Sequence, residues 1–216
     1  MAWISIWENS NLLLSGLEYT LGLTVVTVIT STILGFVVAL LRAARIPVIG
    51  LILRIYFEIF RGSPLLVQIL FVYFGASYLH MYGVSVFVAV SIAITLHQAT
   101  YISEIFRAGF ESVAQGQREA ARSLGLSRFH TTKDVVLPQA MKVALPPLFG
   151  QYISLVKNTS LASVIGAADL VRQGQGIIDR FGNPFEVFLV VAALYFIISY
   201  PMSLIATSLE KRTVKA

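Results

Sequence analysis

Five long apolar stretches limit what this chain can fold into. They run over about 16–41, 53–79, 84–110, 140–165 and 185–209. Each is longer than the roughly 20 mainly apolar residues that a helix needs to cross a bilayer. Together they use most of the 216 residues. We therefore expect an all-α polytopic membrane protein with five transmembrane helices, built as a single transmembrane domain over 1–216.

The composition agrees with a membrane setting and excludes several kinds of chemistry. Only 12% of the residues are charged, against about 25% in a typical soluble domain. The chain has no cysteine, which excludes disulfides, thiolate metal sites and cysteine nucleophiles. Its three histidines are scattered and no nucleophile–base pair is visible, so we expect neither a bound metal nor an enzyme. The sequence also lacks the Gly-Lys dipeptide of an ATP-binding phosphate loop.

The basic residues are unevenly distributed. Two of the sixteen, Arg172 and Arg180, lie in the polar loop before the last apolar stretch. Twelve lie on the other side of the predicted membrane: Arg42, Arg45, Arg54, Arg107, Arg118, Arg122, Arg128, Lys133, Lys142, Lys211, Arg212 and Lys215. Positively charged loops stay cytoplasmic, so we expect the N-terminus outside and the C-terminus inside. Membrane orientation, rather than binding to nucleic acid, then accounts for the net charge of +5.

Four charged residues lie inside the apolar stretches, where a charge is costly and needs a partner, a wet cavity or a function. They are Glu58, Arg61, Glu104 and Lys157. Glu58 and Arg61 are three residues apart, as are Glu104 and Arg107, so each pair can share one helix face. Structural ion pairs and sites on a transport pathway are both open interpretations.

Gly62 and Pro64 interrupt the second apolar stretch. A proline removes a backbone donor and kinks a helix, which is tolerated in lipid only where other groups satisfy the freed carbonyl. We expect a kink here, either as a packing feature or as a hinge or cavity wall.

A polar cluster interrupts the fourth apolar stretch. Lys157 is followed by Asn158, Thr159 and Ser160. These side chains could bind the carboxylate and amine of a small zwitterion, or they could hydrogen-bond between helices. His97 lies midway along the third stretch, where a lone polar residue is usually satisfied inside a bundle.

The segment 116–125 has the composition of a short helix, and Gly125 is suited to a left-handed C-terminal cap. Ala120, Ala121 and Leu124 would form a small apolar strip, and Glu119 could pair with Arg122. The residues alone predict an interfacial helix lying on lipid, with docking against a partner as the alternative.

Several motifs follow one another from about residue 20 to residue 212. They are Tyr56 with Glu58, Arg61-Gly62-Ser63-Pro64, Tyr101 with Glu104 and Arg107, Gly116-Gln117 through Gly125, Leu137-Pro138-Gln139-Ala140, Lys157 through Leu161, and Leu209-Glu210-Lys211-Arg212. This ordered set resembles the permeases of ABC importers. It is most similar to the polar amino acid subfamily, which includes histidine, glutamine, glutamate and arginine permeases.

Three positions depart from that subfamily. Asn158 stands where Asp is frequent, which removes a negative charge that could face a cationic amino group. Asp169 stands where Glu is usual, and His97-Gln98 replaces a smaller polar pair. These departures affect the shape of the pocket and the choice of substrate.

The resemblance implies the type I ABC importer permease fold, with a cytoplasmic coupling helix in the loop at about 112–138. The coupling residues that it implies are Gln117, Glu119, Ala120, Ala121, Arg122, Leu124 and Gly125. Our candidates for substrate binding are Glu58, His97, Asn158, Thr159 and Ser160. Our candidates for structural or gating roles are Arg61, Gly62, Pro64, Glu104, Arg107 and Lys157.

The resemblance also implies partners and a location. An ABC ATPase dimer would bind ATP and Mg, a second permease, identical or related, would complete the pathway, and an extracytoplasmic protein would deliver substrate. The chain itself would hold no cofactor and would be a multi-pass protein of the bacterial inner membrane. The alternative function is an ion-coupled secondary transporter or channel, with Glu58 or Glu104 as its proton or cation site.

Overall fold

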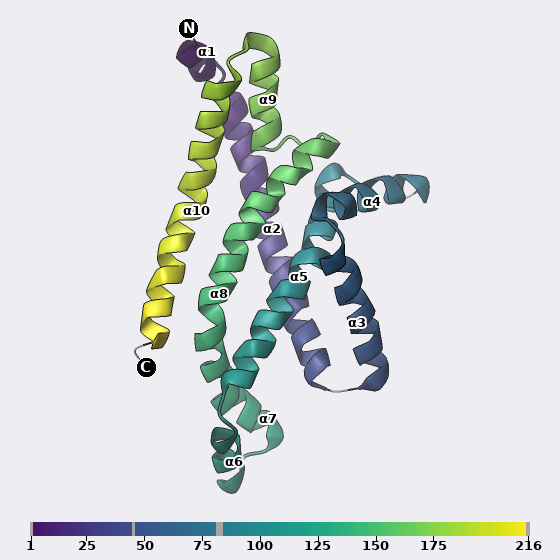
Figure 1. Cartoon of the computed structure of the whole chain (residues 1–216), viewed down its shortest axis with the longest axis vertical. Coiled ribbons are helices and arrows are strands. Elements are labelled where there is room, and N and C mark those ends of the chain that lie inside the picture. The colour runs from purple at the N-terminus through teal and green to yellow at the C-terminus, as the bar shows by residue number, and fades with distance from the viewer. Residues whose placement is uncertain (1, 45, 81–83, 215–216) are drawn as a thin grey trace.

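The computed structural model describes residues 2–44, 46–80 and 84–214. Within these ranges the chain is almost entirely helical and has no β-strand. Figure 1 shows the elements. They are α1 (Ala2–Glu8), α2 (Ser10–Ala43), α3 (Pro47–Gly62), α4 (Leu65–Tyr78), α5 (Val86–Ser112), α6 (Gln115–Ser123), α7 (Arg128–His130), a π-helical turn η1 (Thr131–Val136), α8 (Leu137–Asn158), a 3-10 helix η2 (Thr159–Ile165), α9 (Leu170–Phe181) and α10 (Pro184–Val214).

Helices α2, α5 and α8 form the centre of the molecule, and α10 lies along α8 (Figure 1). Small and hydroxyl side chains on one face of α2 are buried, among them Thr20, Thr27, Ser31 and Gly35. Such residues let two membrane helices approach closely. The Thr27 hydroxyl donates to the carbonyl of Leu23 in its own helix, at 2.6 Å, so it is buried without losing its hydrogen bond.

Three of the described helices are long and apolar enough to cross a membrane: Ser10–Ala43, Val86–Ser112 and Pro184–Lys211. Helices α3 and α4 together would form a fourth span, bent by 108° at the break between them. The fourth expected stretch, 140–165, corresponds to most of α8 followed by η2, and α8 contains Pro146 and Pro147. The number of five spans therefore stays a prediction.

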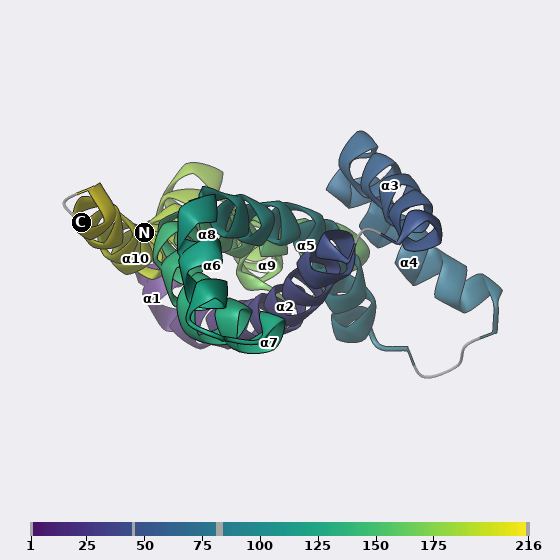
Figure 2. The same ribbon diagram turned by 90° about the horizontal axis from the view of Figure 1, so that it is seen from below.

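Helices α3 and α4 stand apart from the rest of the bundle (Figure 2). Leu53 is the only residue of α3 that is buried, and the buried residues of α4 are Leu65, Gln68 and Ile69. Helix α4 packs mainly on α5. Leu65 and Ile69 pack in a buried cluster with Val90, Ala93 and Ile94 of α5, so α4 joins the pair to the bundle while most of α3 is exposed.

Candidate functional site

The break between α3 and α4 is held by one glutamine. Pro64 lacks the N–H that would bond to the carbonyl of Phe60 four residues earlier. The Nε2 atom of Gln68 donates to that carbonyl at 2.9 Å, and also to the carbonyl and hydroxyl oxygens of Ser63. Gln68 is 7% exposed. Its amide thus satisfies the backbone that Pro64 leaves open, as a break within a membrane requires.

His97 extends this network onto α5. Its Nδ1 atom lies 3.2 Å from Oε1 of Gln68, and its ring contacts the Tyr101 ring at 5.3 Å between centroids. The polar partner that the structure gives to His97 is therefore Gln68, at the break between α3 and α4. A role in substrate binding remains a prediction for this residue.

Arg61 also ties the break to α5. Its guanidinium lies over the rings of Phe57 and Tyr101, 4.6 Å and 5.1 Å from their centroids. Its Nη2 atom donates to the carbonyl of Thr100 at 2.5 Å. Cation–π contacts and a carbonyl acceptor together fix the position of this guanidinium against α5.

The ion pair that spacing allowed between Glu58 and Arg61, one of the interpretations left open, does not form in the described structure. Glu58 instead accepts a hydrogen bond at 3.0 Å from Nε of Arg54, four residues earlier, and both side chains are exposed. Arg61 instead donates to the carbonyl of Thr100 on α5. The spacing along α3 allows Glu58 to pair with either Arg54 or Arg61. Because Arg61 binds α5, Glu58 pairs with Arg54.

The expected pair between Glu104 and Arg107 is confirmed as an ion pair. Glu104 also binds Nη1 of Arg42 on α2 at 2.5 Å, and Arg107 binds Glu111 at 2.5 Å. These four charges form a chain at the end of α5 nearest to α6. Arg42 could not be assigned from spacing, because it approaches from another helix.

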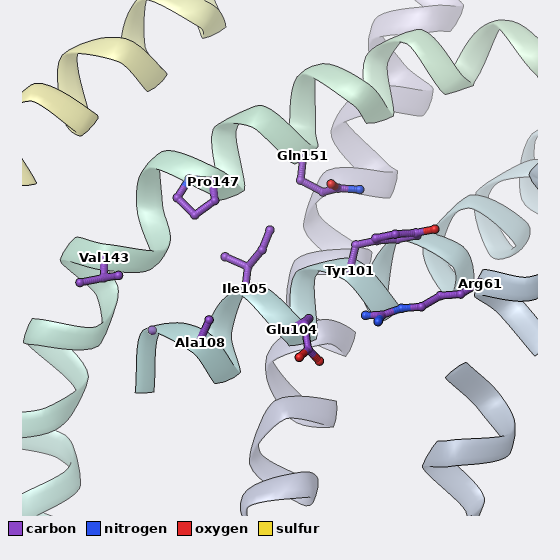
Figure 3. A pocket seen from close by; sticks show the side chains of 9 residues that line it. Arg61, Tyr101, Glu104, Ile105, Ala108, Val143, Pro147 and Gln151 are labelled. Carbon is purple, nitrogen blue, oxygen red and sulfur yellow. The ribbon is translucent and has the colours of Figure 1, made fainter. Parts of the chain in front are cut away.

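Two cavities meet at Arg61 and Glu104. One, of about 360 Å³, lies between α5 and α8, and Figure 3 shows Tyr101 between Gln151 and Arg61 along its side. The second, of about 450 Å³, is lined by α2 and α3 residues that include Arg42, Arg54 and Glu58. Both cavities are lined by Arg61 and Glu104; the rest of the first is mostly apolar, whereas the second has further charged residues of both signs.

The polar cluster after Lys157 lies elsewhere. The Thr159 hydroxyl is buried and donates to the carbonyl of Val156 at 2.7 Å, and that of Ser160 donates to the carbonyl of Lys157 at 2.6 Å. Lys157 lines a third cavity, of about 420 Å³, between α8 and α10. None of these three cavities is lined by both Glu58 and Asn158, so within one chain the structure does not bring these two candidates together.

The loop helix is α6, which begins one residue earlier and ends two residues earlier than the expected segment 116–125. Gly125 has a φ of +83°, as predicted for a left-handed cap. Its N–H donates to the carbonyl of Arg122, and the N–H of Leu126 donates to that of Ala121. This is the Schellman arrangement, which stops the helix and turns the chain. A side chain at position 125 would strain it.

The exposed side chains of α6 differ from those that the sequence predicted. Ala121 is only 5% exposed because α6 packs this side against η1, so it does not belong to the exposed face. Ala120 is exposed, and Leu124 is 83% exposed. Glu119 accepts from Gln115 at 2.7 Å instead of pairing with Arg122. Gln117 and Arg122 are exposed.

Arg118 is a further residue that sequence reasoning left out of the coupling set. Its Nη2 atom donates to the carbonyl of Phe110 at 2.5 Å, which attaches α6 to the end of α5. A charged residue on a polar helix gives no sequence signal for such a contact. Movement of α6 would therefore act directly on the helix that carries Glu104 and Tyr101.

The described parts of the chain contain no group of three or more His, Cys, Asp or Glu residues that could hold a metal ion. The candidate sites are the two cavities at Arg61 and the exposed face of α6. Their residues supply hydrogen bonds, charges and apolar contacts.

Comparison with known proteins gives one consistent family. Residues 31–215 match the family described as the binding-protein-dependent transport system inner membrane component. The glutamine transport system permease protein GlnP of Escherichia coli K12 is 36% identical, over 97% of this chain and 96% of its own. A putative glutamine transport system permease protein GlnP of Rickettsia conorii is 35% identical, over 98% and 97%.

Two solved structures share the fold. A crystal structure of an amino acid ABC transporter with histidines has a TM-score of 0.88 and 37% identity, over 97% of each chain. An inward-facing structure of the MetNI methionine ABC transporter has a TM-score of 0.74 at 20% identity, over 94% of this chain and 96% of that one, which supports the fold alone. The resemblance that the motifs indicated is confirmed. The chain belongs to the family of binding-protein-dependent transport system inner membrane components: it is a membrane-spanning ABC importer permease of the polar amino acid type and not an enzyme.

Proposed function

We propose that this chain imports polar amino acids, with glutamine as the first substrate to test. The support is that relatives at 35% and 36% identity over nearly their full length are named as glutamine permeases. The structure at 37% identity is an amino acid transporter with histidines. An ion-coupled transporter or channel is not favoured, because the matched family works with a binding protein.

In the proposed transporter the chain has three kinds of partner. An ATPase dimer would bind and hydrolyse ATP with Mg, and a second permease, identical or related, would provide the other half of the pathway. A substrate-binding protein would dock at the end of the bundle that carries α9. In this arrangement the N-terminus lies outside and the C-terminus and α6 lie in the cytoplasm, in agreement with the distribution of basic residues.

The observation that carries the mechanism is the exposed face of α6. Ala120 and Leu124 are exposed on a helix that is capped at Gly125 and tied to α5 through Arg118. We propose that this face docks on the ATPase and that Gln117, Glu119 and Arg122 supply its polar contacts. Closure of the ATPase dimer would then shift the bundle between outward-open and inward-open populations.

The test is Leu124→Asp, with Phe181→Asp as a matched control. Phe181 is also a partly exposed apolar side chain, but it lies in α9, at the other end of the molecule. We expect Leu124→Asp to abolish co-purification of the ATPase and uptake, and Phe181→Asp to keep the ATPase bound. Co-purification with Leu124→Asp at the wild-type level would contradict the proposed docking face.

For substrate contact we propose Asn158 first, then Glu58, Thr159, Ser160 and His97. The hydroxyls of Thr159 and Ser160 donate within their own segment, whereas Asn158 is half-buried beside them. Asn158→Ala should raise the concentration for half-maximal uptake without reducing the amount of assembled complex. An unchanged concentration for half-maximal uptake would contradict a role for Asn158 in substrate contact.

A further inference from the structure

Both tryptophans of the chain, Trp3 and Trp7, lie in α1. They are four residues apart, so they share one helix face. Trp3 is 58% exposed and Trp7 is 80% exposed, and Ile4 beside them is exposed as well. Large apolar side chains gathered on one face indicate a surface that is covered by lipid or by another molecule.

Helix α1 is fixed to the bundle through its other side. Ile6 is buried and belongs to a cluster with Leu13 of α2, Leu170 and Ile177 of α9 and Val187 of α10. Figure 1 shows α1 at the same end as α9, opposite α6 and α7. The tryptophans are therefore held at one end of the molecule and not on a free tail.

The surroundings of this face favour lipid over a protein partner. Helix α1 carries one charged residue, Glu8, next to Asn9, which joins α1 to the polar first residues of α2, Ser10 and Asn11. Farther along α2, Leu14 is exposed together with Ser15 and Glu18, and from Leu21 to Leu41 the large exposed side chains are apolar. The tryptophan face thus lies next to a polar segment, beyond which α2 faces lipid. Tryptophan is enriched at this depth because its ring is apolar while its indole N–H prefers water.

We infer that α1 is an interfacial anchor, whose Trp3–Trp7 face inserts among the lipids of the leaflet opposite α6 and α7. In this position α1 sets the depth of α2 and holds the α9–α10 end of the bundle against the membrane surface. A short amphipathic helix with aromatic residues on its apolar face is suited to lie in the plane of the interface.

Because no other tryptophan exists in the chain, tryptophan fluorescence, excited selectively over the nine tyrosines, reports on α1 alone. The full chain would be reconstituted without partners in vesicles whose lipids carry bromine either near the headgroup end or near the tail end of the acyl chain. We expect emission at shorter wavelength than that of free tryptophan. Quenching should be stronger for bromine near the headgroup than near the tail, and iodide in the buffer should quench weakly. Trp3→Phe and Trp7→Phe each leave one reporter, and both should give this pattern.

Strong quenching by iodide together with no effect of brominated lipid would overturn the inference. A second result would also overturn it: quenching of Trp3 and Trp7 by iodide in vesicles that is lost only when the soluble binding protein is added. That result would assign α1 to protein docking.

Discussion

Asp169 is a buried carboxyl group that caps a helix but lowers the stability of the fold when it is ionised. It lies in the loop before α9, outside the membrane-spanning helices, and it is fully buried. Its Oδ1 atom accepts from the N–H of Arg172 at 3.0 Å and caps α9, whereas its Oδ2 atom has no hydrogen-bond partner in the described structure. Burial raises the pKa of Asp169 from its ordinary 3.8 to about 6, against the lowering effect of the backbone N–H groups.

The raised pKa predicts a pH dependence of stability. The folded chain holds this proton to higher pH than the unfolded chain does, so the contribution of Asp169 to folding falls as pH rises from about 4 to about 6 and is constant above. Asp169→Asn keeps a capping oxygen and removes the ionisation. It should therefore raise the free energy of unfolding above pH 6, by up to about 3 kcal/mol.

Melting temperatures in detergent at pH 4 and pH 8 check this. The difference between Asp169→Asn and wild type should be larger at pH 8. Asp179→Asn, in the exposed part of α9, is the control and should show no such change. Equal differences at both pH values would contradict the burial of an ionisable group at position 169.

At the scale of helices, the sequence predicted more of the layout than of the contacts. Helices α2 and α10 contain the first and fifth apolar stretches and extend up to six residues beyond them, and α5 is shifted by two residues from the third. The kink at Gly62 and Pro64 was expected from the loss of a backbone donor. The bend of 108° was not, because it depends on Gln68 and on the surface of α5.

Charge pairs show the same limit. Glu104 and Arg107 lie on one helix, so their spacing was enough to predict the contact. Arg42, Arg61 and His97 reach across to other segments, and no single-helix pattern contains that information. For the same reason Ala121 was assigned to the docking face, although η1 covers it.

Close packing of α2 on α5 predicts a sharp difference between two glycines of α2. A methyl group at Gly35 would lie 2.6 Å from Cγ2 of Ile102, whereas at Gly22 it would meet nothing within 4 Å. Gly35→Ala should therefore destabilise the bundle by about 1–3 kcal/mol. Gly22→Ala should be neutral or stabilising by up to about 1 kcal/mol.

The measurement is thermal unfolding of both variants in the same detergent. A melting temperature for Gly35→Ala equal to that of Gly22→Ala would show that α2 and α5 are farther apart than described.

For the whole molecule, the most informative feature is that the charged network and the broken span converge on α5. Arg61 and His97 tie α3 and α4 to α5, Arg42 ties α2 to its lower part, and Arg118 ties α6 to its end. Helix α5 can therefore transmit a displacement of α6 to the cavities at Arg61 and Glu104. We propose that the partner ATPase supplies this displacement.

Uptake by reconstituted vesicles tests this account most directly. Vesicles would contain the permease either alone or assembled with its ATPase and its binding protein, and radiolabelled glutamine would be followed with and without ATP inside the compartment that faces α6. We predict uptake only by the complete assembly with ATP, and none by the permease alone under a sodium or proton gradient. Gradient-driven uptake by the permease alone would contradict the account.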